Sequence, residues 1–404
     1  MGRPVGPPLA GVRVLDVGTR IAAPFCAGLL GEQGAEVIKI EQPGEGDFMR
    51  GIGPFEDGYS LYWAVEGRGR RSVTLDLRQA AGQALFRRLA ATCDVVVENF
   101  RPGTLERWGI APGDCSSSLV WVRISAFGQD GPKASRPGLD RIGIASGGLL
   151  HLTGYPDRPP VRVGVTISDY LTGVFAAHAA VAALYRRDAR SDSGSGSGSG
   201  AVVDAALYGA SLRILEWTLA AYDRLGVVRE REGNQLNNSA PLDNYPTADG
   251  RFICIVAAGD VGFARLCAAM ARPDLLEDPR FAKLADRAAH GDVINGIVAA
   301  WTSSLPAAEV EAACVAHDVP VATAHTAADI FADPQVVARG DLVTVDDPVV
   351  GPVRQQAPYP RLVGEPSSVP TGAPRLGEHT RSVLADSLGL SDADLDALAA
   401  DGVI

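Results

Sequence analysis

Val12-Arg-Val-Leu-Asp-Val17 is the stretch that sets the architecture, because it is a short apolar run that ends at a glycine, Gly18. A helical pattern over Ala22–Gln33 follows, and Glu36-Val-Ile-Lys-Ile-Glu41 predicts a second buried strand. Two strands joined by a helix in this way form a βαβ unit, in which the strands pair in parallel.

The same alternation continues outward from this unit. Further strands are predicted over 73–77, 94–98, 119–124 and 202–207, with a helix over 79–92. Strands with intervening helices are typical of a largely parallel sheet that is covered on both faces. We therefore predict an α/β fold with a Rossmann-like, doubly wound sheet in a large domain.

The composition changes after about residue 230, which predicts a second, smaller α+β domain. A mostly apolar helical pattern over Tyr208–Leu225 precedes it, and the Asp-Gly pair at 249–250 predicts a hairpin between two strands. Short strands and two helices are expected in the tail from residue 333. We expect a discontinuous large domain in 1–211 and 323–404, a linker helix within 212–235 and a small domain in 236–322.

Composition limits the class of function. The net charge of −11 over 404 residues argues against a general nucleic-acid binder, which needs a basic face. The six cysteines form no Cys-x-x-Cys pair, and the start of the chain lacks a hydrophobic signal core, so a cytoplasmic protein is expected. The histidines show no metal-ligand spacing, and residues 191–200 predict a flexible Ser/Gly loop.

Three common active-site motifs are absent from the sequence. The first strand leads into Gly18-Thr-Arg-Ile-Ala-Ala-Pro24, which is not the G-x-G-x-x-G of dinucleotide-binding proteins. No phosphate-binding G-x-x-x-x-G-K-[ST] loop occurs, and no G-x-S-x-G elbow of a serine hydrolase occurs. The predicted sheet must therefore serve a different chemistry.

One carboxylate, Asp169, stands at the start of a long apolar helix. A strand-like run over Val161–Ile167 turns at Ser168-Asp169 into an alanine-rich helical segment that ends at Tyr185. Free N–H groups of a first helical turn can hold a carboxylate ionised and oriented. The same arrangement also serves as an ordinary helix cap, so the residues alone leave both interpretations open.

Basic side chains, together with one amide and one aromatic ring, cluster in two segments that are predicted to border the sheet. They are Arg68, Arg70 and Arg71 before the third strand, and Asn99, Phe100, Arg101 and Arg107 after the fourth. Arginine matches phosphate oxygens with two parallel hydrogen bonds, and an aromatic ring can stack on a base. The alternative is a set of solvated surface arginines.

Several segments in order resemble the class III CoA-transferases. They are Pro8-Leu-Ala-Gly-Val-Arg-Val-Leu-Asp16, Gly34 to Glu41 with Gly44-Glu-Gly-Asp47, Arg68-Gly-Arg-Arg-Ser-Val-Thr-Leu-Asp-Leu77, Asp94 to Gly103, Gly164 to Asp169, Leu376 to Thr380 and the ending Ala400-Asp-Gly-Val-Ile404. The likeness covers nearly the whole chain. It implies a Rossmann-like fold and an interlocked homodimer.

The resemblance implies that Asp169 is the catalytic nucleophile. Its carboxylate would attack an acyl-CoA thioester, and the CoA thiolate released would attack the resulting anhydride to give an aspartyl-CoA thioester. An acceptor acid would then take the CoA by the reverse steps. The arginines named above, with Asn99 and Phe100, would bind CoA as a substrate, and no metal or redox cofactor would be required.

Two departures from the family concern the acid pocket. Ile21 and Leu139 stand where the formyl-CoA:oxalate enzymes carry a glutamine and a tyrosine, which predicts a more apolar pocket. Tyr170 is expected beside these residues, and Gly259-Asp260 is expected to face the site from the small domain.

Two other functions are weighed against the transferase. An α-methylacyl-CoA racemase needs a second acid/base, which related racemases supply from a Gly-His-Asp motif; here that motif is Gly138-Leu-Asp140, and leucine moves no proton. A non-catalytic CoA-binding protein would bind CoA without transferring it.

Overall fold

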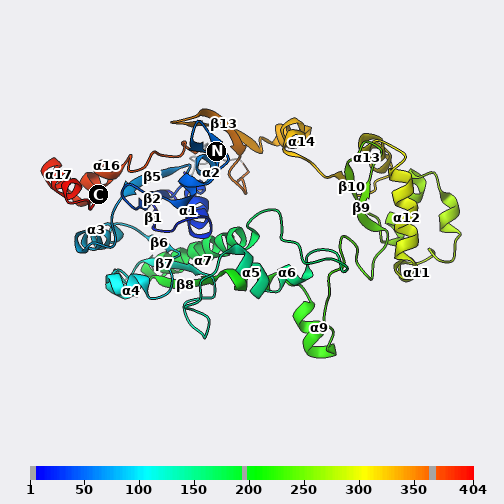
Figure 1. Ribbon diagram of the computed structural model, residues 1–404, viewed down its shortest axis with the longest axis horizontal. Coiled ribbons are helices and arrows are strands. Elements are labelled where there is room, and N and C mark those ends of the chain that lie inside the picture. Colours follow the sequence, from blue (N-terminus) through cyan, green and yellow to red (C-terminus); the bar gives the residue numbers. More distant parts are fainter. Residues whose placement is uncertain (1–5, 193–197, 364–369) are drawn as a thin grey trace. The chain divides into compact units, whose positions relative to one another are not determined.

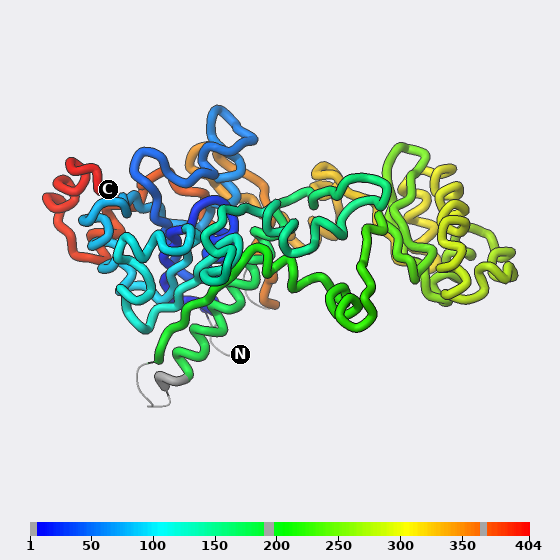
Figure 2. The backbone as a smooth tube through the Cα atoms, turned by 60° about the horizontal axis from the view of Figure 1, so that its bottom comes forward, coloured from blue at the N-terminus to red at the C-terminus, as the bar shows by residue number. Residues whose placement is uncertain are grey.

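The computed structural model describes residues 6–192, 198–363 and 370–404. The chain forms two compact units, of which the first comprises Met1–Leu149, Val163–Leu219 and Ala338–Ile404, and the second Leu150–Arg162 and Ala220–Val337. Within the first unit the C-terminal segment returns to the N-terminal half (Figure 2), where the backbone N–H of Thr74 donates to Thr380 Oγ1 over 2.9 Å.

A six-stranded parallel sheet forms the centre of the first unit. Its order is β5-β2-β1-β6-β7-β8, with β1 (Arg13–Asp16), β2 (Glu36–Glu41), β5 (Arg70–Thr74), β6 (Val95–Glu98), β7 (Val120–Ser125) and β8 (Ala201–Ala206). Counted along the chain this is the strand order 3-2-1-4-5-6 of a doubly wound fold, which confirms the predicted α/β sheet. Val14 pairs in register with Val37 on one side and Val95 on the other.

Helices cover both faces of this sheet (Figure 1). Val95 and Val97 of β6 pack with α1 (Ala22–Glu32) and α7 (Ile167–Asp192), while Val96 packs with α3 (Ala80–Ala90) and α4 (Thr104–Trp108) on the other face. All three valines have no exposed surface. A strand buried on both faces is therefore apolar at successive positions, as the sequence of β6 is.

The first unit also contains several short helices and strands outside the parallel sheet. They are η1 (Phe48–Gly51), β3 (Phe55–Glu56), β4 (Tyr59–Ser60), α2 (Leu61–Glu66), η2 (Pro112–Asp114), α5 (Asp140–Ser146), α8 (Leu207–Arg213), the hairpin β12 (Leu342–Asp347) and β13 (Gly351–Gln356), α16 (Thr380–Leu388) and α17 (Asp392–Ala400). The hairpin and the two C-terminal helices agree with the short strands and two helices expected in the tail from residue 333.

The second unit has its own sheet and core. Its antiparallel sheet has the order β11-β10-β9, formed by β9 (Leu242–Pro246), β10 (Phe252–Val256) and β11 (Val321–Thr323). Its other elements are α10 (Asp260–Ala269), η3 (Pro273–Leu276), α11 (Leu284–Ala289), α12 (Gly291–Thr302), α13 (Ala307–Ala316) and α14 (Ala327–Ala332). The boundaries between the units fall within α6 (Leu149–Leu152), α9 (Thr218–Leu225) and α15 (Pro334–Arg339). The predicted hairpin at 249–250 joins β9 to β10.

Two secondary-structure predictions were wrong. The run at 161–167 joins no sheet in the described chain, since Val161 and Val165 are exposed and α7 already begins at Ile167. The helical pattern over 208–225 forms two helices, α8 and α9, with a break between them. Helix α9 lies within 212–235, where the linker helix is expected. Glu216 has φ 53° at that break, a left-handed conformation through which a right-handed helix cannot continue.

Helix α7 has the length and apolar composition of a membrane span over Ile167–Ala189. Its buried alanines pack against α1 and the sheet. The apolar composition is therefore that of a helix in the protein core. The Ser/Gly loop predicted at 191–200 lies largely outside the described residues.

Helices α1 and α7 approach each other closely at Gly173, one turn after Asp169. A Cβ atom at this position would lie 2.9 Å from Phe25 Cδ1 and 3.0 Å from the carbonyl oxygen of Ala22. We expect Gly173→Ala to lower the free energy of unfolding by about 1–3 kcal/mol, because the two helices must move apart.

Gly296 of α12 provides the matched control for that substitution. An added Cβ meets nothing within 4 Å there, so Gly296→Ala should raise stability by about 0.5–1 kcal/mol. Denaturant unfolding followed by circular dichroism measures both changes. Equal effects of the two substitutions would contradict the packing described for α1 and α7.

Candidate active site

The site lies where the strand order of the sheet reverses. The neighbouring strands β1 and β6 lead to helices on opposite faces, and their carboxyl ends leave a crevice in which open α/β sheets bind ligands. The loop after β1 contains Thr19, and the loop after β6 contains Asn99. The Asn99 side chain joins the loops, since its Oδ1 accepts from the Thr19 N–H over 2.9 Å and its Nδ2 donates to the Thr19 carbonyl over 2.7 Å.

A buried group of charges holds the loop after β1 in place. Lys39 Nζ donates to the Gly18 carbonyl over 2.8 Å and lies 2.9 Å from Asp47 and 3.4 Å from Asp16. The three charged side chains are within 1% of complete burial. Burial alone would lower the pKa of Lys39, but the negative charges of Asp16, Asp47 and Glu41 outweigh it and raise that pKa, so the lysine stays charged. Asp47 Oδ1 also accepts from the backbone N–H of Arg20 over 3.2 Å.

Asp169 is the third residue of α7, and its side chain lines the crevice. No hydrogen bond or ion pair of its carboxylate occurs within residues 6–192, 198–363 and 370–404. Burial and the nearby negative charge of Asp140 raise its pKa to about 7, although the positive charge of Arg20 acts in the opposite direction. An acidic group whose pKa is raised and which has no structural partner is typical of a catalytic residue rather than of a helix cap.

Asp140 fixes the start of α7. Its Oδ1 accepts from the Ser168 N–H over 2.8 Å, and its backbone carbonyl accepts from Ser168 Oγ over 3.1 Å. Asp140, and not Asp169, therefore satisfies a free N–H of the first turn, which leaves the Asp169 carboxylate available. Asp140 is buried, so it acts on Asp169 through its charge and through the placement of the helix.

The crevice has a volume of about 380 Å³. Its wall includes Asp169 together with the predicted residues Ile21, Asn99, Phe100, Arg101 and Leu139. It also includes two arginines, Arg20 and Arg136, that the sequence analysis did not single out. The wall around Asp169 is thus cationic as well as apolar. Arg20 could have been found from its place directly after the first strand at the reversal of strand order.

The three other predicted arginines of the first segment lie elsewhere. Arg70 and Arg71 belong to β5 itself, at its amino end, whereas Asn99 follows the carboxyl end of β6. The amino and carboxyl ends of parallel strands lie at opposite edges of the sheet. The structure therefore does not bring the two basic segments together in one crevice.

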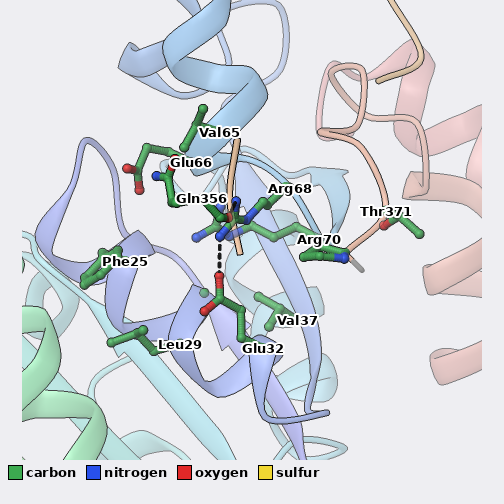
Figure 3. A pocket seen from close by; sticks show the side chains of 14 residues that line it. Phe25, Leu29, Glu32, Val37, Val65, Glu66, Arg68, Arg70, Gln356 and Thr371 are labelled. Carbon is green, nitrogen blue, oxygen red and sulfur yellow. Dashed lines mark hydrogen bonds and ion pairs between the residues drawn. The ribbon is translucent and has the colours of Figure 1, made fainter. Parts of the chain in front are cut away.

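Arg68 and Arg70 line a second cavity, of about 230 Å³, beside α1 (Figure 3). Arg68 Nη2 lies 2.6 Å from Glu32 Oε1, and its Nη1 donates to Gln355 and to the Gln356 carbonyl. Arg70 is 4% exposed and donates to the Pro24 carbonyl. Both guanidinium groups are thus engaged within the protein. Arg71 pairs with Glu36 over 2.8 Å at the same edge of the sheet.

The remaining predicted residues are dispersed. Tyr170 turns away from the crevice: its hydroxyl donates to Glu66 over 2.8 Å and its ring packs edge-on against Phe25. Arg107 is exposed on α4 and donates to Thr104. Gly259 caps α10 in the second unit, and Asp260 pairs there with Arg287 over 2.6 Å, which holds the pKa of Asp260 below its usual range.

The chain matches known proteins over nearly its whole length. Residues 9–380 match CoA-transferase family III, and the chain belongs to this family. It is an enzyme of the class III CoA-transferases.

Two curated relatives come from Chloroflexus aurantiacus. The chain is 42% identical to a succinyl-CoA–D-citramalate CoA-transferase over 98% of both chains. It is 41% identical to the β subunit of a succinyl-CoA–L-malate CoA-transferase, again over 98% of both. Among solved structures, a CAIB/BAIF family protein from Brucella suis superposes with a TM-score of 0.82 at 31% identity, covering 94% of this chain and 99% of that one.

Proposed function

We propose that the protein moves CoA from an acyl-CoA to a carboxylic acid through a covalent intermediate on Asp169. The observation that carries the proposal is the unpartnered Asp169 carboxylate in the crevice at the carboxyl ends of β1 and β6. Succinyl-CoA is the first donor to assay, since the names of both Chloroflexus relatives contain it.

The reaction divides into four exchanges in which no proton is gained or lost. The Asp169 carboxylate attacks the thioester carbonyl carbon, and the C–S bond breaks to give a mixed anhydride and CoA thiolate. The thiolate then attacks the aspartyl carbonyl carbon and expels the donor acid as a carboxylate. The acceptor carboxylate and the thiolate repeat these steps in reverse, which frees Asp169.

The geometry supplies what this chemistry requires. A carboxylate that is partly removed from water and makes no hydrogen bond keeps its electron pairs available for attack. The start of α7 favours the negative charge electrostatically, and Arg20 favours it further. We assign the CoA nucleotide to the neighbouring part of the crevice, where Asn99, Phe100, Arg101 and Arg136 lie.

Exchange of isotope between succinate and succinyl-CoA tests the proposal. The enzyme should exchange labelled succinate into succinyl-CoA without any second acid, because the donor half of the reaction is reversible on its own. A protein that binds CoA but exchanges no label would contradict the proposal and would favour a non-catalytic CoA-binding role.

The exchange rate should depend on pH with a midpoint near the pKa of the nucleophile. Asp169 attacks only when ionised, and its pKa is about 7, so the rate should rise with pH and level off above that value. Initial exchange rates over roughly pH 5.5–8.5 measure this profile. A rate that is already maximal at the acid end would contradict the pKa assigned to Asp169.

The proposed assembly is a cytoplasmic homodimer. Exposed apolar side chains along α7 support a partner surface: Val174, Phe175, Val181 and Tyr185. The six cysteines are free thiols, in agreement with a reducing compartment. Light scattering that gives the mass of a single chain would contradict the dimer.

A further inference from the structure

We propose that Arg20 binds the distal carboxylate of the acid substrate, so that the enzyme selects dicarboxylic acids. The inference rests on the proposed function, since it assigns the second end of the acid that Asp169 activates. It makes Arg20 a specificity-determining residue of the crevice.

The backbone of Arg20 is held in an unusual conformation. Its φ is 68°, a left-handed value that is uncommon outside glycine and is enriched at active sites and ligand-binding sites. In this conformation the Arg20 N–H donates to Oδ1 of the buried Asp47 over 3.2 Å. Because Asp47 is itself paired with Lys39, the whole buried charge group directs the position of Arg20.

The side chain is positioned but has no charged partner. The guanidinium carbon lies 3.8 Å from the centre of the Phe48 ring, so the group is stacked on a flat apolar support. No carboxylate in the described part of the chain forms an ion pair with it. A guanidinium that is oriented by stacking keeps its N–H donors free for a planar, two-oxygen ligand such as a carboxylate.

Arg20 and Asp169 line the same crevice of about 380 Å³. Arg20 lies near enough to Asp169 for its positive charge to act against the rise in the pKa of Asp169. A four- or five-carbon diacid could present one carboxyl carbon to Asp169 and its other carboxylate to Arg20.

Comparison with relatives points to the same chemistry. Succinate, D-citramalate and L-malate, the acids named for the two Chloroflexus proteins, all carry two carboxylates. CoA phosphates have other cations available in the crevice, Arg101 and Arg136. Arg20 is therefore assigned to the acid and not to the nucleotide.

Matched acids and matched variants test the proposal. Succinate is compared with butyrate, which replaces the distal carboxylate by a methyl group, on wild type, Arg20→Gln and Arg20→Lys. Transfer rates are measured as kcat/KM at about pH 8.5, above the pKa of Asp169, so that loss of the Arg20 charge changes the ionisation of Asp169 little. Acid binding to the full-length protein with free CoA present is measured by calorimetry at the same pH. Arg136→Gln is the control for removal of a different positive charge from the same wall.

We expect Arg20→Gln to lower kcat/KM and binding for succinate by about 10- to 100-fold, the loss expected for a hydrogen bond to a charged group. Butyrate and free CoA should be affected less than about threefold, and Arg20→Lys should recover part of the preference. Arg136→Gln should change succinate and butyrate by the same factor.

Equal losses for succinate, butyrate and free CoA in Arg20→Gln would overturn the proposal, because they would place Arg20 on the nucleotide. No loss for succinate would also overturn it. The calorimetric arm tests Arg20 even in a protein that transfers no CoA, whereas isotope exchange by the wild type tests the proposed function. The two can therefore fail separately.

Discussion

Asp169→Asn is expected to abolish CoA transfer while the protein remains folded. Asparagine has nearly the same shape, but its amide cannot form the anhydride or the aspartyl thioester, so no covalent path remains. Loss of a nucleophile lowers kcat by about 10⁴-fold or more. The measurement is succinyl-CoA-dependent transfer under saturating acid, with the isotope exchange described above as a second readout.

The stability of Asp169→Asn distinguishes a catalytic Asp169 from a structural one, because the two roles predict changes of opposite sign in the free energy of unfolding. The folded-state pKa of Asp169 is about 7, above the ordinary value of 3.8, so ionisation costs the folded state free energy. Asparagine removes that cost. The variant should therefore be more stable than wild type, by an amount that grows between pH 4 and pH 7 and is constant above that.

Asp188→Asn is the matched control, because Asp188 lies on the same helix and is exposed. It should retain full activity and show little change in stability. If Asp169→Asn kept transfer activity, or if it unfolded more readily than wild type, Asp169 would be a helix-capping residue and not a nucleophile.

Lys39→Met is expected to cause the largest loss of stability. Methionine fills a similar volume but leaves the buried Asp47 without the cation that lies 2.9 Å from it, and leaves Asp16 with Arg70 alone, whose Nε is 3.6 Å away. It also leaves the Gly18 carbonyl without its donor. Removing one partner of a buried ion pair costs about 3–5 kcal/mol. Denaturant unfolding measures the change, and activity should fall as well because the loop that carries Arg20 loses its support.

Lys283→Met is the control for the loss of a lysine charge alone, since Lys283 is exposed. Its stability should stay within about 0.5 kcal/mol of wild type. A similarly small effect of Lys39→Met would show that the buried charges do not hold the loop after β1.

The sheet could be predicted because its strands are buried on both faces. Such strands are short continuous apolar runs, and Val12–Val17, Glu36–Glu41 and Asp94–Glu98 each lie within a residue of the observed β1, β2 and β6. The strand predicted at 161–167 failed because alternating valines indicate a strand only where a neighbouring strand can pair with them. The sequence of the segment itself does not show whether such a neighbouring strand exists.

The candidate site could be predicted only in part. One crevice contains Asp169, Ile21, Asn99 and Phe100. The last three follow the two strands at which the strand order reverses, and Asp169 stands at the start of a helix beside them. Arg70 was predicted to lie before the third strand. It is instead the first residue of β5, which begins three residues before the predicted start, so Arg70 lies at the edge of the sheet opposite the crevice. The place of Arg20 in the loop after the first strand made it a candidate, but the positive φ and the distant Asp47 that set it apart are contained in no short motif.

The most direct test of the account is mass spectrometry of the wild-type protein after incubation with succinyl-CoA and hydroxylamine. Hydroxylamine converts an activated aspartyl carbonyl into a hydroxamate, which remains on the chain through digestion. We predict a hydroxamate on the peptide that contains Asp169, absent when succinyl-CoA is omitted and absent from Asp169→Asn. An unmodified Asp169 in a preparation that transfers CoA would contradict the covalent mechanism.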